Sequence, residues 1–249
     1  MPASEDDEVC FKKSEYIVYH PYAGLDLAYH AKKVCFSGQS RYQKVDIIDN
    51  EAYGRMLLLD GNIQHTSYDA GIFNEALCGA AKRGGAARIL VLGGGSGQTV
   101  MSLLRSSKVE RITVAEIDEL VVEACRKHIK GVRQAFDDPR VGVVIADAFK
   151  YIHETPERFD AAIVDLTESP FGLANSMALL NRFYADVRRK CEGRCSQYIG
   201  SSVGLAYSPR LRRLALGLGE QVLSAVRYEE VFIPSFGAPH VFMHAGYAR

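Results

Sequence analysis

The chain has 249 residues, of which 47% are hydrophobic and 24% charged, the composition of an ordinary globular protein with a large buried core. Its 30 acidic and 30 basic residues balance, so no net field attracts nucleic acid or an anionic membrane surface. No apolar stretch approaches the roughly 20 residues that span a bilayer, and the first residues, MPASEDDEV, are acidic, unlike a signal peptide. We therefore expect a soluble, cytoplasmic protein that binds neither nucleic acid nor membranes.

Six cysteines are spread over the whole chain: Cys10, Cys35, Cys78, Cys125, Cys191 and Cys195. The last two are spaced C-x-x-x-C, but no second pair of ligands lies near them in the sequence, as a zinc site would need. The histidines are also scattered, without a metal-binding spacing such as H-E-x-x-H. We therefore expect reduced thiols packed as small apolar side chains, and no metal site.

The first part of the chain carries β-strand signals. Residues 1–9 are acidic and polar, so a disordered tail is expected there. From Tyr16 to Thr66, stretches rich in β-branched and aromatic residues alternate with turn signals, among them the Asp60-Gly61 pair. These features predict a small antiparallel β domain over residues 10–68.

Residues 69–249 show a repeated order of strand, loop and helix. A helix is expected near residues 70–82, and then RILVL, RITVAEI, VGVVIA and FDAAIV are each followed by a loop or a helical segment. Continuous apolar strands that alternate with helices indicate a parallel sheet covered on both faces. The last two strands are joined by the short loop Pro234–Pro239, so they should be antiparallel.

The segment VLGGGSGQTV lies between the first of these strands and its helix. Here backbone N–H groups and the positive end of the helix face the crevice beyond the strand ends. Gly93, Gly95 and Gly97 carry no Cβ, so a ligand can approach the backbone closely. A dinucleotide-binding loop has a third small residue where this chain has Gln98, which disfavours a cofactor with a pyrophosphate.

Acidic residues end the three strands that follow the first. Glu116 comes about twenty residues after the loop, where a carboxylate can accept both hydroxyls of a ribose. Asp147 follows the next strand, where the adenine amino group would lie in an adenosyl site, and Asp165 ends the strand after that. An alternative for Asp147, and for Asp118, is that each only caps the helix that begins after it. Taken together with the glycines, the acids favour an adenosyl site on one edge of the sheet.

These residues resemble the polyamine aminopropyltransferases, the spermidine and spermine synthases. The resemblance begins at about Tyr42 and rests on RYQKVDII, YGRMLLLDGNIQHT, ILVLGGGSGQ, VAEID, DDPRVGVVIADAFKYI, FDAAIVDLTESP and IPSF. It implies an α/β fold with a Rossmann-like sheet of the class I methyltransferase type, mostly parallel with an antiparallel last strand. It also implies that the small N-terminal β domain assembles a homodimer or homotetramer, and that residues 69–249 form the catalytic domain.

The resemblance further implies roles for individual residues. The donor would be decarboxylated S-adenosylmethionine, or S-adenosylmethionine itself, and the acceptor a small-molecule amine. Asp165 would be the catalytic base. The donor would be held by Gln43, Leu59, Asn74, Gly93, Gly95, Ser96, Gly97, Glu116, Asp147 and Ala148. The amine would contact Phe73, Glu168, Tyr198 and Phe236.

The stretch VDLTESPFG sets Asp165 and Glu168 at the end of an apolar strand. A protonated alkylamine has a pKa of about 10, so exposing its lone pair at neutral pH costs roughly 4 to 5 kcal/mol. A carboxylate beside the nitrogen attracts the ammonium form and accepts its proton as the C–S bond breaks. Asp165 suits that role, whereas Glu168 would either neutralise a second ammonium group or remain a solvated loop acid. The segment Ser169–Ser176 is expected to close over the bound amine.

Several residues depart from the family pattern. The family's glycine loop usually reads G-G-G-D-G-G, and its Asp receives the amine of the aminopropyl tail. Here that residue is Ser96, which would not repel the carboxylate of S-adenosylmethionine and so favours methyl transfer. Ala70, Phe73 and Asn74 replace an acid, a tyrosine and a His or Gln. Phe236 replaces a second tyrosine, and the lost polar contacts predict a less polar or shorter acceptor.

Three functions remain open at this stage. The first is aminopropyl transfer to a di- or polyamine, and the second is N-methylation of an amine by S-adenosylmethionine on the same fold. The third is a catalytically silent subunit that binds an adenosyl ligand or a partner synthase, against which the retained Asp165 argues. A nicotinamide dehydrogenase is disfavoured, because residue 98 is not glycine and no acid for hydride transfer stands out.

Overall fold

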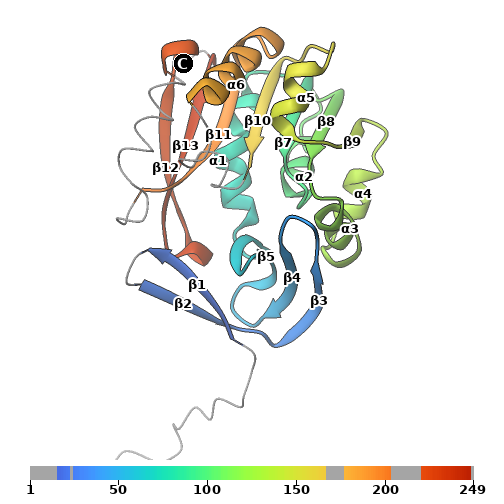
Figure 1. Cartoon of the computed structure of the whole chain (residues 1–249), viewed down its shortest axis with the longest axis vertical. Helices are drawn as coiled ribbons and strands as arrows, with labels where there is room; N and C mark the ends of the chain where they lie inside the picture. The colour runs from blue at the N-terminus through green and yellow to red at the C-terminus, as the bar shows by residue number, and fades with distance from the viewer. Residues whose placement is uncertain (1–15, 23–24, 167–176, 203–219, 248–249) are drawn as a thin grey trace, which may run out of the picture.

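The computed structural model describes residues 16–22, 25–166, 177–202 and 220–247. Figure 1 shows a small β part at the bottom, in blue, and a larger α/β part above it. The first part ends with a strand at Thr66, and the first helix of the second begins at Ala70. The tail expected over residues 1–9 and the segment expected to close over the amine lie outside the described residues.

The N-terminal part consists of a hairpin and a four-stranded antiparallel sheet in the order β3-β4-β5-β6. The strands are β1 (Tyr16–Tyr22), β2 (Leu25–His30), β3 (Lys33–Gln39), β4 (Lys44–Asn50), β5 (Gly54–Leu59) and β6 (Asn62–Thr66). The predicted turn between β5 and β6 is present, with φ of 48° at Asp60 and 77° at Gly61. Two successive positive φ values are what a tight hairpin turn requires. The antiparallel β fold of this part is confirmed.

The four-stranded sheet buries both of its faces. Ile47 and Leu57 point toward the α/β part and belong to its main core. Ile48 and Leu58 point the other way and pack with Phe236 near the end of the chain. Successive side chains of each strand point to opposite faces, so the small sheet packs against two regions of the molecule.

The α/β part contains one seven-stranded sheet in the order β12-β13-β11-β10-β7-β8-β9. Its strands are β7 (Arg88–Gly93), β8 (Arg111–Glu116), β9 (Val141–Ile145), β10 (Ala161–Asp165), β11 (Cys195–Ser201), β12 (Arg227–Ile233) and β13 (Ala238–Ala245). The pairs from β11 to β9 are parallel, and β13 is antiparallel to both of its neighbours. The mostly parallel sheet and its antiparallel last strand are both confirmed.

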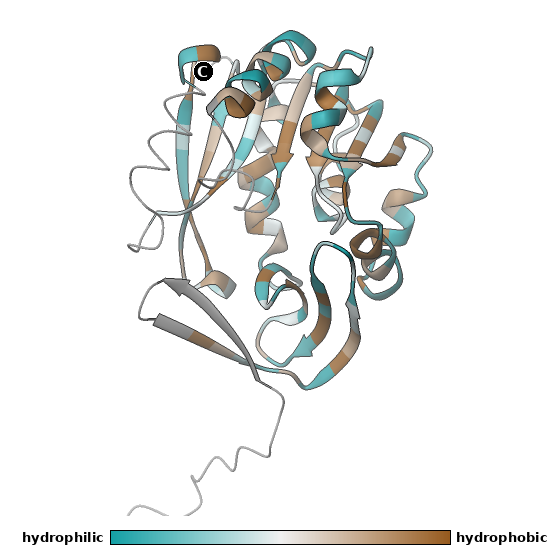
Figure 2. Ribbon diagram, viewed as in Figure 1, coloured by the Kyte–Doolittle hydropathy of each residue, from teal (hydrophilic) through white to brown (hydrophobic). Residues whose placement is uncertain are grey.

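Helices cover the two faces of this sheet. They are α1 (Ala70–Arg83), α2 (Gln98–Leu104), α3 (Glu119–His128), α4 (Val132–Phe136), α5 (Ala148–Glu154) and α6 (Met177–Lys190), with a 3-10 turn, η3, at Pro234–Phe236. Buried residues of α1 to α4 join Ile89 and Val91 in one core, and those of α5 and α6 join Leu90 and Leu92 in the other. Figure 2 shows the hydrophobic colour concentrated on the central strands between these layers.

The expected state of the cysteines is confirmed for the described residues. Cys35, Cys78, Cys125, Cys191 and Cys195 are free thiols, and all except Cys35 are buried. In the same described ranges, no helix combines the length and the apolar character that crossing a bilayer requires.

Candidate functional site

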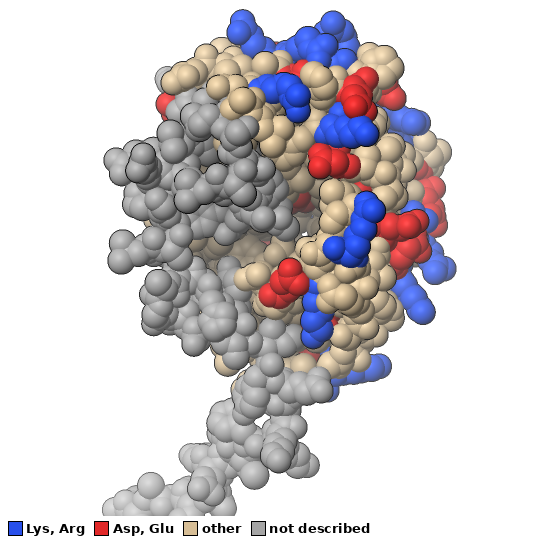
Figure 3. All heavy atoms as spheres, viewed as in Figure 1, with Lys and Arg blue, Asp and Glu red and all other residues tan. Residues whose placement is uncertain are grey.

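The four strand ends chosen from the sequence lie side by side. Strands β10, β7, β8 and β9 are consecutive in the sheet, and Asp165 is directly paired with Gly93. Because parallel strands end at the same edge, the glycine loop, Glu116, Asp147 and Asp165 meet there. Figure 3 shows a hollow near the centre of one face, with acidic and basic side chains interspersed around it.

A cavity of about 1140 Å³ opens at this sheet edge, which is ample for a nucleoside with a side arm. Most of the predicted site residues line it: Gln43, Leu59, Phe73, Gly93, Gly95, Ser96, Glu116, Asp147, Ala148, Asp165, Tyr198 and Phe236. Asn74 lines an adjoining recess of about 20 Å³, which shares Ser96 and Asp165 with the larger cavity. Gly97 lines neither space, and Glu168 lies outside the described residues.

Glu116 is held in place by backbone donors. Its Oε2 accepts a hydrogen bond from Gly95 N, and its Oε1 accepts one from Asp118 N, both at 3.0 Å. A Cβ at position 95 would lie 2.8 Å from Oε2, so a larger residue there would displace the Glu116 carboxylate. Burial raises the pKa of Glu116, and the backbone donors offset part of that rise. Each carboxylate oxygen can accept a second hydrogen bond, which suits a pair of ribose hydroxyls.

The other two glycines predicted for the site are constrained by close contacts within the protein. Gly93 has φ of 84°, and a Cβ there would lie 2.2 Å from the backbone oxygen of Asp165. Gly97 has φ of 75° as the N-cap of α2, and a Cβ there would lie 2.5 Å from Val132. Close packing of the chain on itself is therefore a reason for these glycines beside ligand approach.

The helix-capping alternative is confirmed for both aspartates to which it applied. Asp118 accepts from Leu120 N at the start of α3, and Asp147 accepts from Lys150 N at the start of α5. Asp147 nevertheless lines the large cavity, so capping and ligand contact are compatible. Asp118 also accepts from Gln43 Nε2 at 3.0 Å, which fixes the predicted Gln43 at the edge of the cavity.

Asp165 lies where the large cavity meets the recess. Its Oδ2 accepts a hydrogen bond of 2.6 Å from Thr99 Oγ1. Burial raises the pKa of Asp165 above the ordinary carboxyl range, and the Thr99 hydroxyl offsets only part of that rise. A carboxylate of raised pKa is a stronger base while it is still ionised at neutral pH.

An aromatic wall, formed by Phe73, Tyr198 and Phe236, lines the cavity together with Asp165, and the rings of His240 and Phe242 pack against it. The Phe73 ring centroid is 5.1 Å from those of Tyr198 and Phe242, and 6.2 Å from that of Phe236. The Tyr198 hydroxyl shares a hydrogen bond of 2.8 Å with His240 Nδ1. Burial lowers the pKa of His240 to about 4, so the imidazole is neutral at physiological pH.

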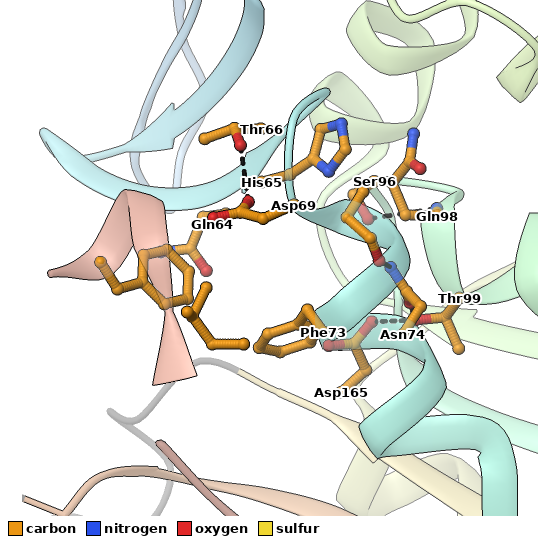
Figure 4. Close-up of a pocket in the computed structure, with 13 residues that line it drawn as sticks. Gln64, His65, Thr66, Asp69, Phe73, Asn74, Ser96, Gln98, Thr99 and Asp165 are labelled. Carbon is orange, nitrogen blue, oxygen red and sulfur yellow. Dashed lines mark hydrogen bonds between the residues drawn. The ribbon is translucent and has the colours of Figure 1, made fainter. Parts of the chain in front are cut away.

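Two residues that the sequence analysis did not select shape the site. Thr99 binds Asp165, and it follows the glycine loop directly, so its place in the motif could have identified it. Asp69 is only 2% exposed, and it accepts from Ser235 N at 2.7 Å, which anchors the turn that carries Phe236. In Figure 4, Asp69 lies beside the recess that Thr99 and Asp165 line.

Phe149 belongs both to the core and to the cavity wall. Its ring lies 4.7 Å from that of Phe183 in the core between α5 and α6, and it also lines the cavity. Within the described ranges, no three His, Cys, Asp or Glu side chains gather in a way that could hold a metal ion.

Both parts of the chain match known protein domains. Residues 70–242 match the spermine/spermidine synthase domain, and residues 16–67 match the spermidine synthase tetramerisation domain. The chain belongs to the spermine/spermidine synthase family. The resemblance stated from the motifs is therefore confirmed, and the two matched domains meet between β6 and α1.

Individual relatives agree with the family assignment. A polyamine aminopropyltransferase of Hyperthermus butylicus is 39% identical over 161 residues, which are 62% of this chain and 55% of the relative. Another, of Aeropyrum pernix, is 30% identical over 220 residues, which are 87% of this chain and 70% of the relative. The matched part of the chain thus spans little more than half the length of the first relative.

Solved structures of the family share the fold. A spermidine synthase in complex with the transition state analogue AdoDATO superposes with a TM-score of 0.83 at 26% identity, covering 95% of this chain and 82% of that one. The spermidine synthase of Thermotoga maritima gives a TM-score of 0.82 at 25% identity, covering 95% and 81%. The order of the small β part and the larger sheet is therefore the family's own.

Proposed function

We propose that this protein transfers an aminopropyl group from decarboxylated S-adenosylmethionine to a di- or polyamine. The observation that carries the proposal is the position of Asp165, a partly buried carboxylate of raised pKa in the same cavity as Glu116 and the glycine loop. Family membership and the spermidine synthase bound to AdoDATO support the same reaction.

In this proposal each part of the cavity has a separate task. Glu116 accepts the ribose hydroxyls, Asp147 faces the adenine, and the glycine loop lies along the donor. The aromatic wall borders the acceptor amine. Holding nitrogen, carbon and sulfur in line supplies much of the rate enhancement, because a positive sulfur is already a good leaving group.

The chemical step is a displacement with one proton transfer. The ammonium group of the acceptor gives a proton to Asp165, and the freed nitrogen lone pair attacks the methylene carbon attached to sulfur. The C–N bond forms as the C–S bond breaks. The electron pair of the C–S bond stays on sulfur, so the donor leaves as methylthioadenosine, a neutral thioether. A buried carboxylate favours proton uptake, because burial disfavours its charged form.

Methyl transfer from S-adenosylmethionine to an amine is the second candidate, and Ser96 favours it. Ser96 lines both the cavity and the recess, and its hydroxyl accepts from Gln98 N at 3.4 Å. A neutral hydroxyl provides no charge complement for an ammonium tail, and it does not repel a carboxylate.

The test compares the two donors side by side with putrescine and spermidine as acceptors. Mass spectrometry of the amine product identifies the transferred group, and the nucleoside product confirms the turnover. The predicted products are an aminopropylated amine and methylthioadenosine. If the only product is a methylated amine formed from S-adenosylmethionine, the proposed aminopropyl transfer is wrong and the second candidate is right. If the protein transfers an aminopropyl group, Ser96→Asp should improve the use of the decarboxylated donor relative to S-adenosylmethionine.

The same assay tests the base. Asp165→Asn should lower kcat by about 10² to 10⁴-fold while donor affinity is retained, because Asn cannot accept the proton. Asp137→Asn, at an exposed position that lines neither space, is the matched control and should keep full activity. A fully active Asp165→Asn enzyme would exclude the proposed role.

We further propose that residues 16–67 assemble copies of this chain into a homodimer or homotetramer. The match to the family's tetramerisation domain supports this proposal.

A further inference from the structure

Asp165 is the first member of a chain of three hydrogen-bonding side chains, of which the other two are buried. Thr99 Oγ1 lies 2.6 Å from Asp165 Oδ2 and 3.1 Å from Asn74 Oδ1. Asn74 and Thr99 are 5% and 1% exposed, so water does not compete for these contacts. Figure 4 shows the three side chains pointing toward one another beside the recess.

The orientation of the Asn74 amide is fixed by a separate contact. Its Nδ2 donates a hydrogen bond of 2.8 Å to the backbone oxygen of Ala70, one turn earlier in α1. The amide oxygen must therefore face Thr99, and it can only accept. The Thr99 hydroxyl has a single proton and two acceptors, Asp165 and Asn74.

The charge of Asp165 decides which acceptor receives that proton. While the carboxylate is ionised, the shorter, charge-assisted bond to Asp165 is favoured. Asn74 Oδ1 then faces an oxygen lone pair at 3.1 Å with no proton between them. If Oδ2 is protonated instead, it donates to Thr99, Thr99 turns its proton to Asn74, and all three groups are satisfied.

We propose that Thr99 and Asn74 form a two-way hydrogen-bond switch that positions Asp165 when ionised and stores the proton that Asp165 takes from the amine. A half-turn about the Cβ–Cγ bond of Asp165 exchanges its two oxygens, so a proton received from the cavity side can be turned toward Thr99. On the Thr99 side of Asp165, the proton is kept away from the amine nitrogen while that nitrogen forms its bond to carbon. Thr99 and Asn74 are positioning residues, and storing the substrate's proton rests on the proposed function of Asp165.

Few other groups in the described part of the chain act on the carboxylate. Thr99 is the only hydrogen-bond donor to Asp165 among those residues. Burial raises the pKa of the Cys78 thiol on α1, and the charge of Asp165 adds to that rise, so the thiol is neutral. His65 and Asp69 line the recess from the β6 side, and Glu116 lines the shared cavity from β8. Burial keeps His65 neutral, with a pKa of about 4.

The test measures the protonation of Asp165 in the purified full-length protein, without requiring turnover. Infrared difference spectra over a pH titration report the carboxyl group, which is assigned by its loss in Asp165→Asn. Thr99→Val should raise the pKa of Asp165 by about one unit, because the ionised form loses its donor. Thr99→Ser should retain the native value. Thr99→Ala removes the same hydroxyl and serves if the Val variant does not fold.

Asn74→Leu should lower the pKa of Asp165, because the protonated form loses the acceptor for the Thr99 proton. The double variant Thr99→Val with Asn74→Leu separates this effect from the added burial that Leu brings. Relative to the matching parent, Asn74→Leu should lower the pKa by about one unit more when Thr99 is intact than in the Thr99→Val background. Equal shifts in the two backgrounds would overturn the switch.

Activity measurements distinguish the switch from the proposed function. In an active enzyme, the acid limb of the pH profile of kcat/KM should move to higher pH in Thr99→Val and to lower pH in Asn74→Leu. If the infrared shifts appear but no donor alkylates any amine, the switch stands and the proposed function fails. If amines are alkylated and the infrared shifts are absent, the switch fails and the proposed function stands.

Discussion

The two ends of the cavity are built differently. At the end near Glu116 and Asp147, both carboxylates are held by backbone N–H groups or cap a helix. At the end near Asp165, the wall consists largely of aromatic side chains, among them Phe73 and Phe236, for which the family resemblance indicates tyrosine. The carboxylates of the first end are held by the backbone, whereas Asp165 at the second end is held by the Thr99 side chain.

This difference explains where the chain departs from its family. Replacing Glu116 would leave the N–H groups of Gly95 and Asp118 without their partner, so the fold as well as the ligand constrains that residue. Replacing a tyrosine of the aromatic wall by phenylalanine removes a hydroxyl and keeps the packing. We therefore expect recognition of the adenosyl part of the donor to follow the family and acceptor choice to be particular to this chain.

The largest effect expected in this comparison is on donor affinity. Glu116→Gln should weaken the binding of methylthioadenosine by about 10 to 100-fold, because the amide cannot accept hydrogen bonds at both of its ends. The preference among amines should not change. Isothermal calorimetry gives the affinity, and competition between putrescine and a monoamine gives the preference.

The control for this variant is Glu110→Gln. Glu110 is exposed and stands just before β8, at the opposite end of the strand from Glu116. It should bind methylthioadenosine as the unchanged protein does. Unaltered affinity in Glu116→Gln would mean that the nucleoside lies elsewhere.

A smaller effect is expected at the aromatic wall. Phe73→Tyr should raise kcat/KM for putrescine relative to a monoamine by about fivefold, because one neutral hydrogen bond contributes about 1 kcal/mol. The Phe73 ring is partly exposed and lines the cavity, so a hydroxyl has room there. Competition assays with both amines measure the ratio directly.

Phe149→Tyr makes the same chemical change at the other end of the cavity. Phe149 also lines the cavity and is partly buried, but it stands on α5 directly after Asp147 and Ala148. The ratio of the two amines should stay constant in this variant. If the two variants shift the ratio equally, the division into donor and acceptor ends is wrong.

The sequence predicted the parts of the fold that depend on local pattern. Apolar strands such as Arg88–Gly93 predicted the parallel sheet, and the short Pro234–Pro239 loop predicted its antiparallel last pair. The short helix α4 was not predicted, because Val132–Phe136 is too brief for helical periodicity to be recognised.

Much of the candidate site was also predictable, since parallel strand ends gather without knowledge of side-chain contacts. Contacts between distant segments were not predictable. The Thr99 hydroxyl meets Asp165 across 66 residues, and Asp69 meets Ser235 across 166. Thr99 and Asp69 stand at helix starts, where a polar side chain has an ordinary local explanation, so only the folded chain reveals their partners.

The most direct test of the central claim is a crystal structure with methylthioadenosine and an amine bound together. We predict that the nucleoside lies between Glu116 and Asp147, with the amine nitrogen within about 3 Å of an Asp165 oxygen. An ordered amine out of reach of Asp165, or a nucleoside bound away from the glycine loop, would contradict it.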